Sequence, residues 1–219
     1  MANNNPQRER IIARLRAATA TDKAHHHESH QTQPTATSEI FAPIPDPRER
    51  FLRECSTNLT EVVLTTTCAE SVAAFERLLP SIPDGELFFQ SADVFRNWAD
   101  RVNGSRTIRW STEGPPREIT EATVTLAHAF VAQTGSILTS SKCGGRGASI
   151  VPACHIVFGT RTQIVPDIQA ALQQAQDELL DASFVGLISG SSRTADIEKI
   201  LVQGAHGPRR VVIILQEQD

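Results

Sequence analysis

The residues best suited to chemistry lie at 189–208, between two apolar runs near the C-terminus. Ser192 and Thr194 have hydroxyl groups that can cap a helix, and the pattern predicts a short helix beginning near Ala195. Arg193 adds a fixed positive charge beside this helix start. Free N–H groups at the start of a helix favour a phosphate or a carboxylate. The segment therefore predicts an anion-binding turn, and the alternative interpretation is that the same residues only begin a helix well.

Two further polar loops contain the glycines that anion-binding turns require. The first is Gln133–Ser136, and the second is 142–147, in which Lys142 and Arg146 are the cations. Glycine lets successive backbone N–H groups line a concave site, and Gly190 gives the same freedom to the C-terminal turn. Ligands collect at the carboxyl ends of strands in open α/β sheets. Together the three loops predict a site for an acidic small molecule, either a carboxylate or a phosphate.

Two residues close to the C-terminal turn are candidates for moving a proton. Asp196 can serve as a general base, although its position near a helix start also suits capping. His206 lies in a Gly-Ala-His-Gly turn that would hold it at the edge of the sheet, whereas His155 is interpreted as a structural residue. The candidate catalytic residues are Asp196 and His206, and the candidate substrate-binding residues are Thr134, Gly135, Ser136, Arg146, Gly190, Ser192, Arg193 and Thr194.

The use of cysteine and histidine predicts no metal site in this chain. The four cysteines include no C-x-x-C pair, so neither a zinc ribbon nor an iron–sulfur cluster is indicated. We expect free thiols in a reducing compartment and a cytoplasmic protein. The adjacent pair Cys154–His155 supplies too few ligands. The histidines at 25–27 and 30 belong to a polar tract that we interpret as solvated, although it could bind a metal weakly.

Charge and hydropathy exclude two other classes of partner. The net charge of −4 argues against general nucleic-acid binding, which requires a basic face. No apolar run has the length of a transmembrane segment, and the N-terminus has no apolar core of the signal-peptide type.

The chain of 219 residues is expected to form one domain with an N-terminal appendage. Residues 1–18 contain Ile11, Ile12 and Leu15 between arginines, a spacing that predicts a basic amphipathic helix. Residues 19–45 are rich in Thr, Gln, His, Ser and Pro, and are expected to form a flexible linker. The folded domain is expected over 46–219.

Within this domain the elements alternate between strand and helix, which predicts a parallel-sheet α/β domain. Residues 123–131 and 136–140 are interpreted as two β runs joined by a Gly-bearing turn, with a helix over 127–132 as the alternative. Strands are predicted at 61–65, 86–89, 107–110, 155–158, 184–188 and 211–215, and helices at 48–55, 69–79, 92–102 and 163–180.

Five pieces of the sequence match a known family: Gln133–Ser136, Ser149–Pro152 with His155–Val157, Gln163–Pro166, Ser189–Glu198 and Gly204–Pro208. On these pieces the chain resembles the lactate-utilisation protein C family, whose shared unit is called the LUD domain. The resemblance covers roughly Ile119 to the C-terminus. The chain departs from the family at Gln133, where Glu is common, and at Ser191, where Pro or Ala is common.

The resemblance implies a three-layer α/β/α fold with a mostly parallel sheet, similar to sugar-phosphate isomerases, CoA transferases and 5-formyltetrahydrofolate cyclo-ligase. It also implies a role in the oxidation of L-lactate to pyruvate together with iron–sulfur partner proteins, with no cofactor in this chain. Two alternatives remain. One is a stand-alone enzyme of the isomerase or ligase type acting on a phosphorylated or CoA-linked ligand, and the other is a non-catalytic assembly subunit. Whether the chain is itself an enzyme is left open.

Overall fold

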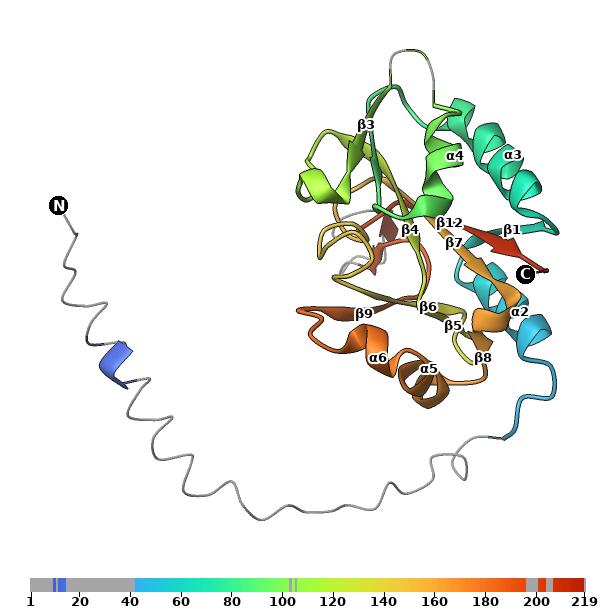
Figure 1. The fold of residues 1–219 in the computed structure, drawn as a ribbon. Helices are drawn as coiled ribbons and strands as arrows, with labels where there is room; N and C mark the ends of the chain where they lie inside the picture. The colour runs from blue at the N-terminus through green and yellow to red at the C-terminus, as the bar shows by residue number, and fades with distance from the viewer. Residues whose placement is uncertain are drawn as a thin grey trace. The chain divides into compact units, whose positions relative to one another are not determined.

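The computed structural model describes residues 10, 12–14, 42–102, 104, 106–195, 201–203 and 207–218 (Figure 1). Contacts divide the chain into two units, Met1–Ala42 and Pro43–Asp219. In the first unit Arg10 and residues 12–14 are helical. The remainder of the expected helix and most of the expected linker lie outside the described residues.

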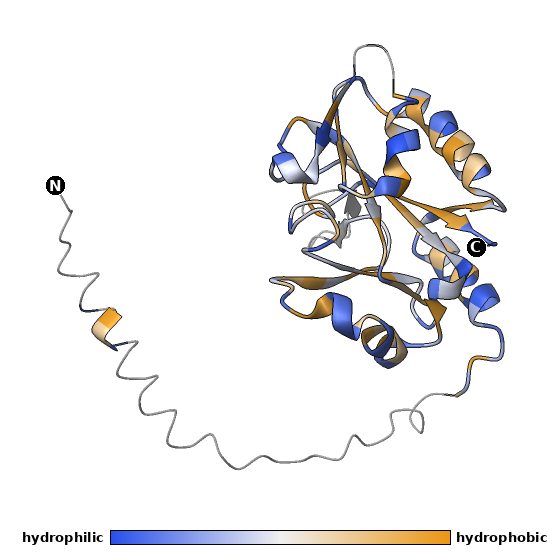
Figure 2. Cartoon of the chain, viewed as in Figure 1, coloured by the Kyte–Doolittle hydropathy of each residue, from blue (hydrophilic) through white to orange (hydrophobic). Residues whose placement is uncertain are grey.

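A six-stranded sheet forms the centre of the second unit. All of its neighbouring strands are parallel, as the alternation of elements predicts. Their order is β1 (Glu61–Thr65), β12 (Arg210–Gln216), β7 (Cys154–Thr160), β4 (Thr120–Leu126), β2 (Glu86–Phe89) and β3 (Thr107–Trp110). Figure 2 shows these strands as predominantly hydrophobic, which is typical of a sheet covered on both faces.

One face of this sheet is covered by α3 (Cys68–Leu78), η3 (Asp93–Phe95) and α4 (Arg96–Ala99). The side chain of Thr67 caps α3 by accepting a hydrogen bond from the N–H of Glu70. The helix gives way to η2 (Leu79–Ser81) at Pro80, which has no N–H to continue it. The ring centroids of Trp98 and Phe75 lie 5.1 Å apart in the core beneath these helices.

The opposite face is covered by α2 (Pro47–Thr57) and by a second, four-stranded sheet. Strand β12 shows the division between the faces, because Val212 and Ile214 pack toward α3 whereas Val211, Ile213 and Leu215 pack toward α2. The order of the second sheet is β8 (Ile164–Val165), β5 (Ala129–Val131), β6 (Ser136–Ser140) and β9 (Val185–Ile188). Its outer face packs on α5 (Ile168–Gln174) and α6 (Gln176–Leu179) (Figure 1). The predicted three-layer α/β/α fold is confirmed.

Two predicted elements differ from the structure, and one alternative is excluded. The helix predicted over 163–180 begins only at Ile168, because residues 164–165 pair with β5 as a strand and Asp167 caps the helix that follows. The strand predicted at 184–188 joins the second sheet antiparallel to β6 rather than the parallel sheet. Residues 129–131 form β5, which rules out the alternative helix there.

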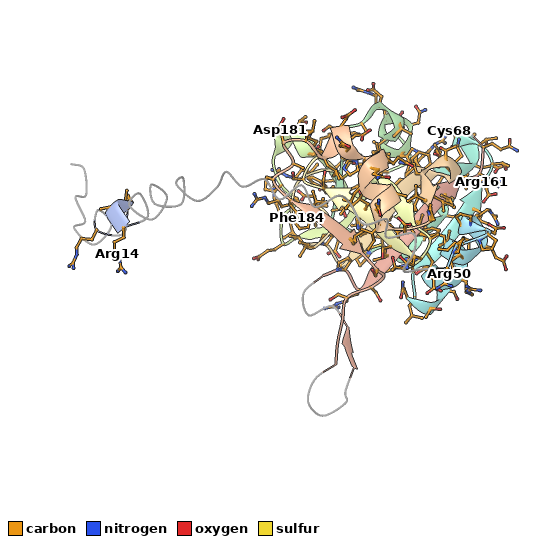
Figure 3. The ribbon with its side chains drawn as sticks, turned by 90° about the horizontal axis from the view of Figure 1, so that it is seen from below. Arg14, Arg50, Cys68, Arg161, Asp181 and Phe184 are labelled. Atoms are coloured by element: carbon orange, nitrogen blue, oxygen red, sulfur yellow. The ribbon has the colours of Figure 1, made fainter. Side chains whose placement is uncertain are left out.

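The helix predicted near Ala195 is also wrong. Residues Arg193–Ala195 form β10 and pair antiparallel with β11, Leu201–Gln203. Thr194 pairs with Val202 in this ladder, and β-branched residues favour extended backbone. Figure 3 shows the two strands projecting from the body of the domain. Among the described residues, the turn therefore leads into a strand rather than into the helix start on which the predicted anion site depends.

Candidate functional site

The chain leaves two neighbouring strands of the main sheet toward opposite faces. After β2 it continues into η3 and α4, whose Phe95 and Trp98 belong to the core on the α3 face. After β4 it continues into β5, whose Phe130 belongs to the core on the α2 face. Such a switch point opens a crevice outside the carboxyl ends of the strands, where α/β proteins bind ligands.

A cavity of about 540 Å³ occupies this position, and we call it the crevice. Its volume falls within the usual range for small-molecule sites. The lining residues come from the ends of β2 and β4, the glycine-rich turn after β6, η5 (Arg161–Gln163) and the helices α5 and α6. They are Gln90, Leu126, Ala127, His128, Lys142, Cys143, Gln163, Gln174 and Glu178.

Two glutamine side chains fix the backbone around the crevice. The Oε1 of Gln90 accepts a hydrogen bond of 2.8 Å from the N–H of Leu126, so it joins the ends of β2 and β4. The Nε2 of Gln163 donates a hydrogen bond of 2.8 Å to the carbonyl of Ala127. Its Oε1 accepts one of 2.7 Å from the N–H of Thr160, at the end of β7. The amides therefore satisfy backbone groups that the strands leave unpaired.

His128 follows β4 and lines the crevice with an imidazole held by two neighbours. Its Nε2 lies 2.8 Å from the Oγ of Ser140 and 3.3 Å from the Sγ of Cys143. The Oγ of Ser140 also accepts a hydrogen bond of 3.1 Å from the backbone N–H of Lys142. This arrangement favours an unprotonated Nε2 that accepts from the hydroxyl and the thiol.

The pKa of His128 lies below its ordinary value. Burial is the largest cause, the negative charge of Glu178 opposes it, and the positive charge of Lys142 lowers the pKa further. The imidazole is therefore mostly neutral at pH 7 and can accept a proton. Lys142 enters none of the ion pairs found among the described residues, so its charge is not neutralised by a close carboxylate.

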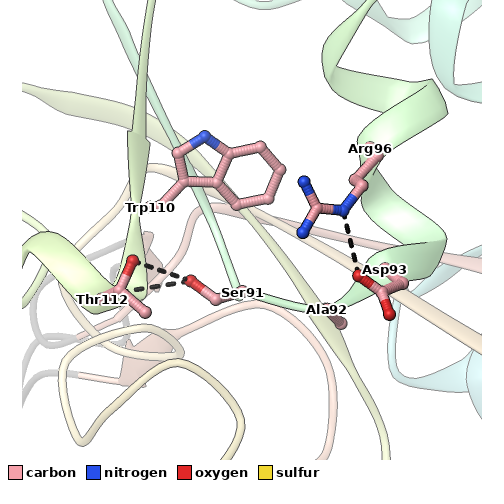
Figure 4. A pocket seen from close by; sticks show the side chains of 6 residues that line it. All are labelled: Ser91, Ala92, Asp93, Arg96, Trp110 and Thr112. Carbon is pink, nitrogen blue, oxygen red and sulfur yellow. Dashed lines mark hydrogen bonds and ion pairs between the residues drawn. The ribbon is translucent and has the colours of Figure 1, made fainter.

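A second cavity of about 280 Å³ lies beside the carboxyl ends of β2 and β3 (Figure 4). Arg96 lines this cavity, but its guanidinium is already paired, because the Nε of Arg96 lies 3.0 Å from the Oδ1 of Asp93. The hydroxyl of Ser91 lies within hydrogen-bond distance of Thr112. Because its charged groups satisfy one another, this cavity is a weaker candidate for an anion than the crevice.

The structure brings two of the predicted loops together, but at the other end of β6. The Oγ of Ser136 lies 2.7 Å from the Oγ1 of Thr134 and 2.6 Å from the Oγ of Ser189. The side chain of Asn58, directly after α2, donates a hydrogen bond of 2.8 Å to the carbonyl of Thr134. The N–H of Ser192 donates one of 2.8 Å to the carbonyl of Pro208, just before β12. This hydroxyl cluster therefore lies toward the amino ends of β1 and β12.

Gly135 and Gly190 allow these loops to approach α2 closely. Gly135 has a φ of +62°, and a Cβ there would lie 2.7 Å from the carbonyl carbon of Glu54. Gly190 has a φ of +90°, and a Cβ there would overlap the carbonyl oxygen of Asn58. Both glycines are therefore required by the packing of the loops on α2.

We expect Gly190→Ala to lower the free energy of unfolding by about 2 kcal/mol, because it adds a backbone clash to a left-handed conformation. Gly145→Ala is the matched control. Gly145 has a φ of +98°, and a Cβ there would have no atom within 4 Å, so only the conformational cost of about 1 kcal/mol applies. Urea denaturation would measure both, and equal losses would contradict the close approach of Gly190 to Asn58.

The remaining predicted site residues are placed as follows. Arg146 donates a hydrogen bond of 3.1 Å to the hydroxyl of Ser183 and does not line the crevice. For Arg193 and Thr194 the structure describes the backbone alone, and Asp196 and His206 lie outside the described residues. Of the cations in the predicted loops, Lys142 is the one that lines the crevice in the part of the chain described.

Sequence reasoning missed His128, Gln90, Gln163 and Glu178. The available signal was positional, because Gln90 directly follows the strand predicted at 86–89 and His128 is a polar interruption of the β run predicted at 123–131. Within the described ranges, no group of three or more His, Cys, Asp or Glu residues is placed to hold a metal ion. Across the same residues, no helix has both the length and the apolar character needed to cross a bilayer.

The fold and the crevice define a three-layer α/β/α protein with a cavity at the switch point of a parallel sheet. Residues 48–216 match the family model of the LUD domain, and the chain belongs to the LUD domain family. The resemblance identified in the sequence is therefore confirmed.

The curated relatives of this chain include several named Lactate utilization protein C. The one from Macrococcus caseolyticus is 34% identical over 177 residues, which cover 76% of each chain. The one from Bacillus subtilis is 27% identical over 148 residues, covering 63% of this chain and 61% of the relative. The one from Deinococcus radiodurans is 30% identical over 97 residues, covering 43% of this chain and 46% of the relative. The matched part is thus less than two thirds of the last two proteins.

A crystal structure of a DUF162 family protein from Deinococcus radiodurans has a similar fold. Its TM-score is 0.55 at 16% sequence identity, and the match covers 79% of this chain and 99% of that chain. At this identity the likeness supports the fold alone.

Proposed function

We propose that this chain is a component of an L-lactate utilisation system and that its crevice binds a small carboxylate, lactate or pyruvate. The name of the curated relatives supports the system. The observation that carries the ligand site is the crevice at the switch point, where Lys142 and a neutral His128 line the same cavity.

In this proposal the chain's own residues bind and orient the metabolite. The ammonium of Lys142 supplies the counter-charge for the carboxylate, and a charge-assisted hydrogen bond of this kind is worth about 1.5–3 kcal/mol. His128 presents a polar ring that the hydroxyl and thiol beside it hold in one orientation. The amides of Gln90 and Gln163 hold the backbone of Leu126 and Ala127 in place beside the crevice.

The oxidation of lactate to pyruvate releases two electrons and two protons. We propose that iron–sulfur partner proteins accept the electrons, as the family resemblance implies. This division of labour agrees with cysteine usage in the sequence, which includes no C-x-x-C pair. The substrate-binding role of the hydroxyl cluster stays a prediction. The hydroxyl groups of the cluster hydrogen-bond one another.

Growth on L-lactate tests the proposed function. A strain without the gene should fail to grow on L-lactate and grow normally on glucose. The wild-type gene should restore growth, and Lys142→Met should restore it poorly because the carboxylate loses its counter-charge. Arg77→Met, which removes one positive charge from the last turn of α3, is the matched control and should restore growth fully. Normal growth of the deletion strain on L-lactate would contradict the proposal.

A further inference from the structure

We propose that Cys143 and His128 form a nucleophilic pair that adds reversibly to the carbonyl carbon of a 2-oxo acid in the crevice. This inference rests on the proposed function, since it assumes that a small carboxylate enters the cavity. It goes further by assigning a covalent step to the chain and by separating the 2-oxo acid from the 2-hydroxy acid. Pyruvate has the electrophilic carbon that the thiol requires, whereas lactate does not.

The geometry of the pair is that of a nucleophile and its base. The Sγ of Cys143 lies 3.3 Å from the Nε2 of His128, within hydrogen-bond reach for sulfur. Both residues line the crevice, so the thiol and the base meet the same ligand. The hydroxyl of Ser140, 2.8 Å from the same nitrogen, orients the ring.

The turn that holds Cys143 is fixed by its backbone and its neighbours. The N–H of Cys143 donates a hydrogen bond of 2.9 Å to the carbonyl of Ser140. Gly144 follows with a φ of +90°, and a Cβ there would lie 3.1 Å from the ring of Phe88 and 3.3 Å from the Cβ of Ala148. The turn is therefore packed against the end of β2, which limits the positions that the thiol can reach.

The resting protonation states suit a step in which the proton moves only during attack. Burial raises the pKa of the Cys143 thiol, with hydrogen bonds from Thr139 and Ser140 opposing it, so the thiol is protonated at pH 7. The pKa of His128 is lowered, so the imidazole is free to accept that proton. The charged groups in the same lining are Lys142 and Glu178. Lys142 disfavours the protonated ring and Glu178 favours it.

The step balances without any further reactant. The sulfur forms a bond to the carbonyl carbon, and the π electrons of the C=O bond move to its oxygen. The proton passes from Sγ to Nε2 of His128 and then to the new alkoxide, which gives a thiohemiketal. No group leaves, and the addition requires neither an oxidant nor a reductant. The reverse steps release the 2-oxo acid unchanged.

The other three cysteines provide internal comparisons. Cys68 is exposed at the start of α3, as Figure 3 shows. Cys55 and Cys154 are buried, as Cys143 is, and burial raises their pKa values to about 12 and about 11. None of these three lines the crevice. Among the four cysteines, Cys143 alone should therefore react slowly with general alkylating reagents and rapidly with a 2-oxo acid analogue.

The full-length chain labelled with 3-bromopyruvate and, separately, with iodoacetamide tests the pair by peptide mass spectrometry. We expect the preference for bromopyruvate over iodoacetamide to be at least about tenfold greater at Cys143 than at Cys68. In the crevice Lys142 and His128 can position and activate bromopyruvate beside the Cys143 thiol, whereas Cys68 lies outside the crevice. Pyruvate should protect Cys143 and leave Cys68 unprotected. Equal preferences at the two thiols, or no protection by pyruvate, would overturn the inference.

A second measurement observes the adduct directly and uses Cys143→Ala as its control. With [2-¹³C]pyruvate bound to the wild-type chain, NMR should show a carbon signal shifted from the carbonyl to the tetrahedral region, and Cys143→Ala should abolish that signal. If Cys143→Ala and wild type bind pyruvate equally and no tetrahedral signal appears, the covalent step is wrong and the proposed binding function stands. If neither pyruvate nor lactate binds the wild-type chain, both fail.

Discussion

Phe130→Ala should lower the free energy of unfolding by about 4 kcal/mol, as is usual when a buried aromatic ring is truncated. Phe130 has no exposed surface and lies between the main sheet and the second sheet. Its ring centroid is 5.3 Å from that of Phe51 on α2. Removal of the ring would leave a cavity in the hydrophobic core that α2 shares with the two sheets. Urea denaturation followed by tryptophan fluorescence would measure the loss, and a change below about 1 kcal/mol would contradict this packing.

A double-mutant cycle makes this prediction more specific. A Cβ at Gly159 on β7 would overlap the ring of Phe130, and would also meet the side-chain oxygen of Gln163 at 2.6 Å. Gly159→Ala alone should therefore destabilise the domain. In the Phe130→Ala background its cost should fall by about 1 kcal/mol or more, because the ring is gone and the new methyl group fills part of the cavity. Additive losses would show that Gly159 and Phe130 do not contact each other.

Acidification from pH 6.5 to pH 4 should remove about 3 kcal/mol of stability through His155 alone. His155 is 1% exposed, and burial lowers its pKa to about 4. Its Nε2 lies 2.8 Å from the Oγ1 of Thr125, whereas Nδ1 has no hydrogen-bond partner among the described residues. The protonated ring would thus be a buried charge with no compensating carboxylate close by.

The sign follows from the two pKa values. The folded-state pKa of about 4 lies below the ordinary value of 6.5, so between these values the unfolded chain binds more protons. The stabilising contribution is complete above pH 6.5 and is lost as the pH falls through 4. His155→Gln is the control, because an amide can still bond Thr125 but does not titrate. The stability difference between wild type and this variant should shrink by about 3 kcal/mol over that range, and a constant difference would contradict the prediction.

The strands of the main sheet are readable from the sequence because each is a short apolar or β-branched run between breaking residues. The predictions at 61–65, 86–89 and 107–110 coincide with β1, β2 and β3. The strand with which a segment pairs depends on residues far away in the sequence, which explains the wrong predictions elsewhere. Val185–Ile188 has the composition of a core strand, but its partner is β6 rather than the parallel sheet. Ile164–Val165 fits the helical pattern of the residues that follow, but it forms a strand because it pairs with β5.

The crevice depends on topology, which no short motif encodes. His128 is a lone histidine in its stretch of sequence, and its place in the lining of the crevice arises because β2 and β4 are neighbours with connections on opposite faces. The glycines of the predicted loops indicate turns with unusual backbone conformations, and Gly135 and Gly190 do have positive φ values. At Gly135 and Gly190, however, their freedom serves close packing on α2. Lys142 was predicted as a cation of an anion-binding loop, and it does line the cavity.

Isothermal titration of pyruvate and L-lactate into the full-length chain is the most direct measurement of the proposed ligand site. We expect binding to wild type and to Arg77→Met, and at least about tenfold weaker binding to Lys142→Met, which corresponds to about 1.4 kcal/mol. Binding that is unchanged in Lys142→Met, or absent in wild type, would contradict the assignment of the crevice as the site for a small carboxylate.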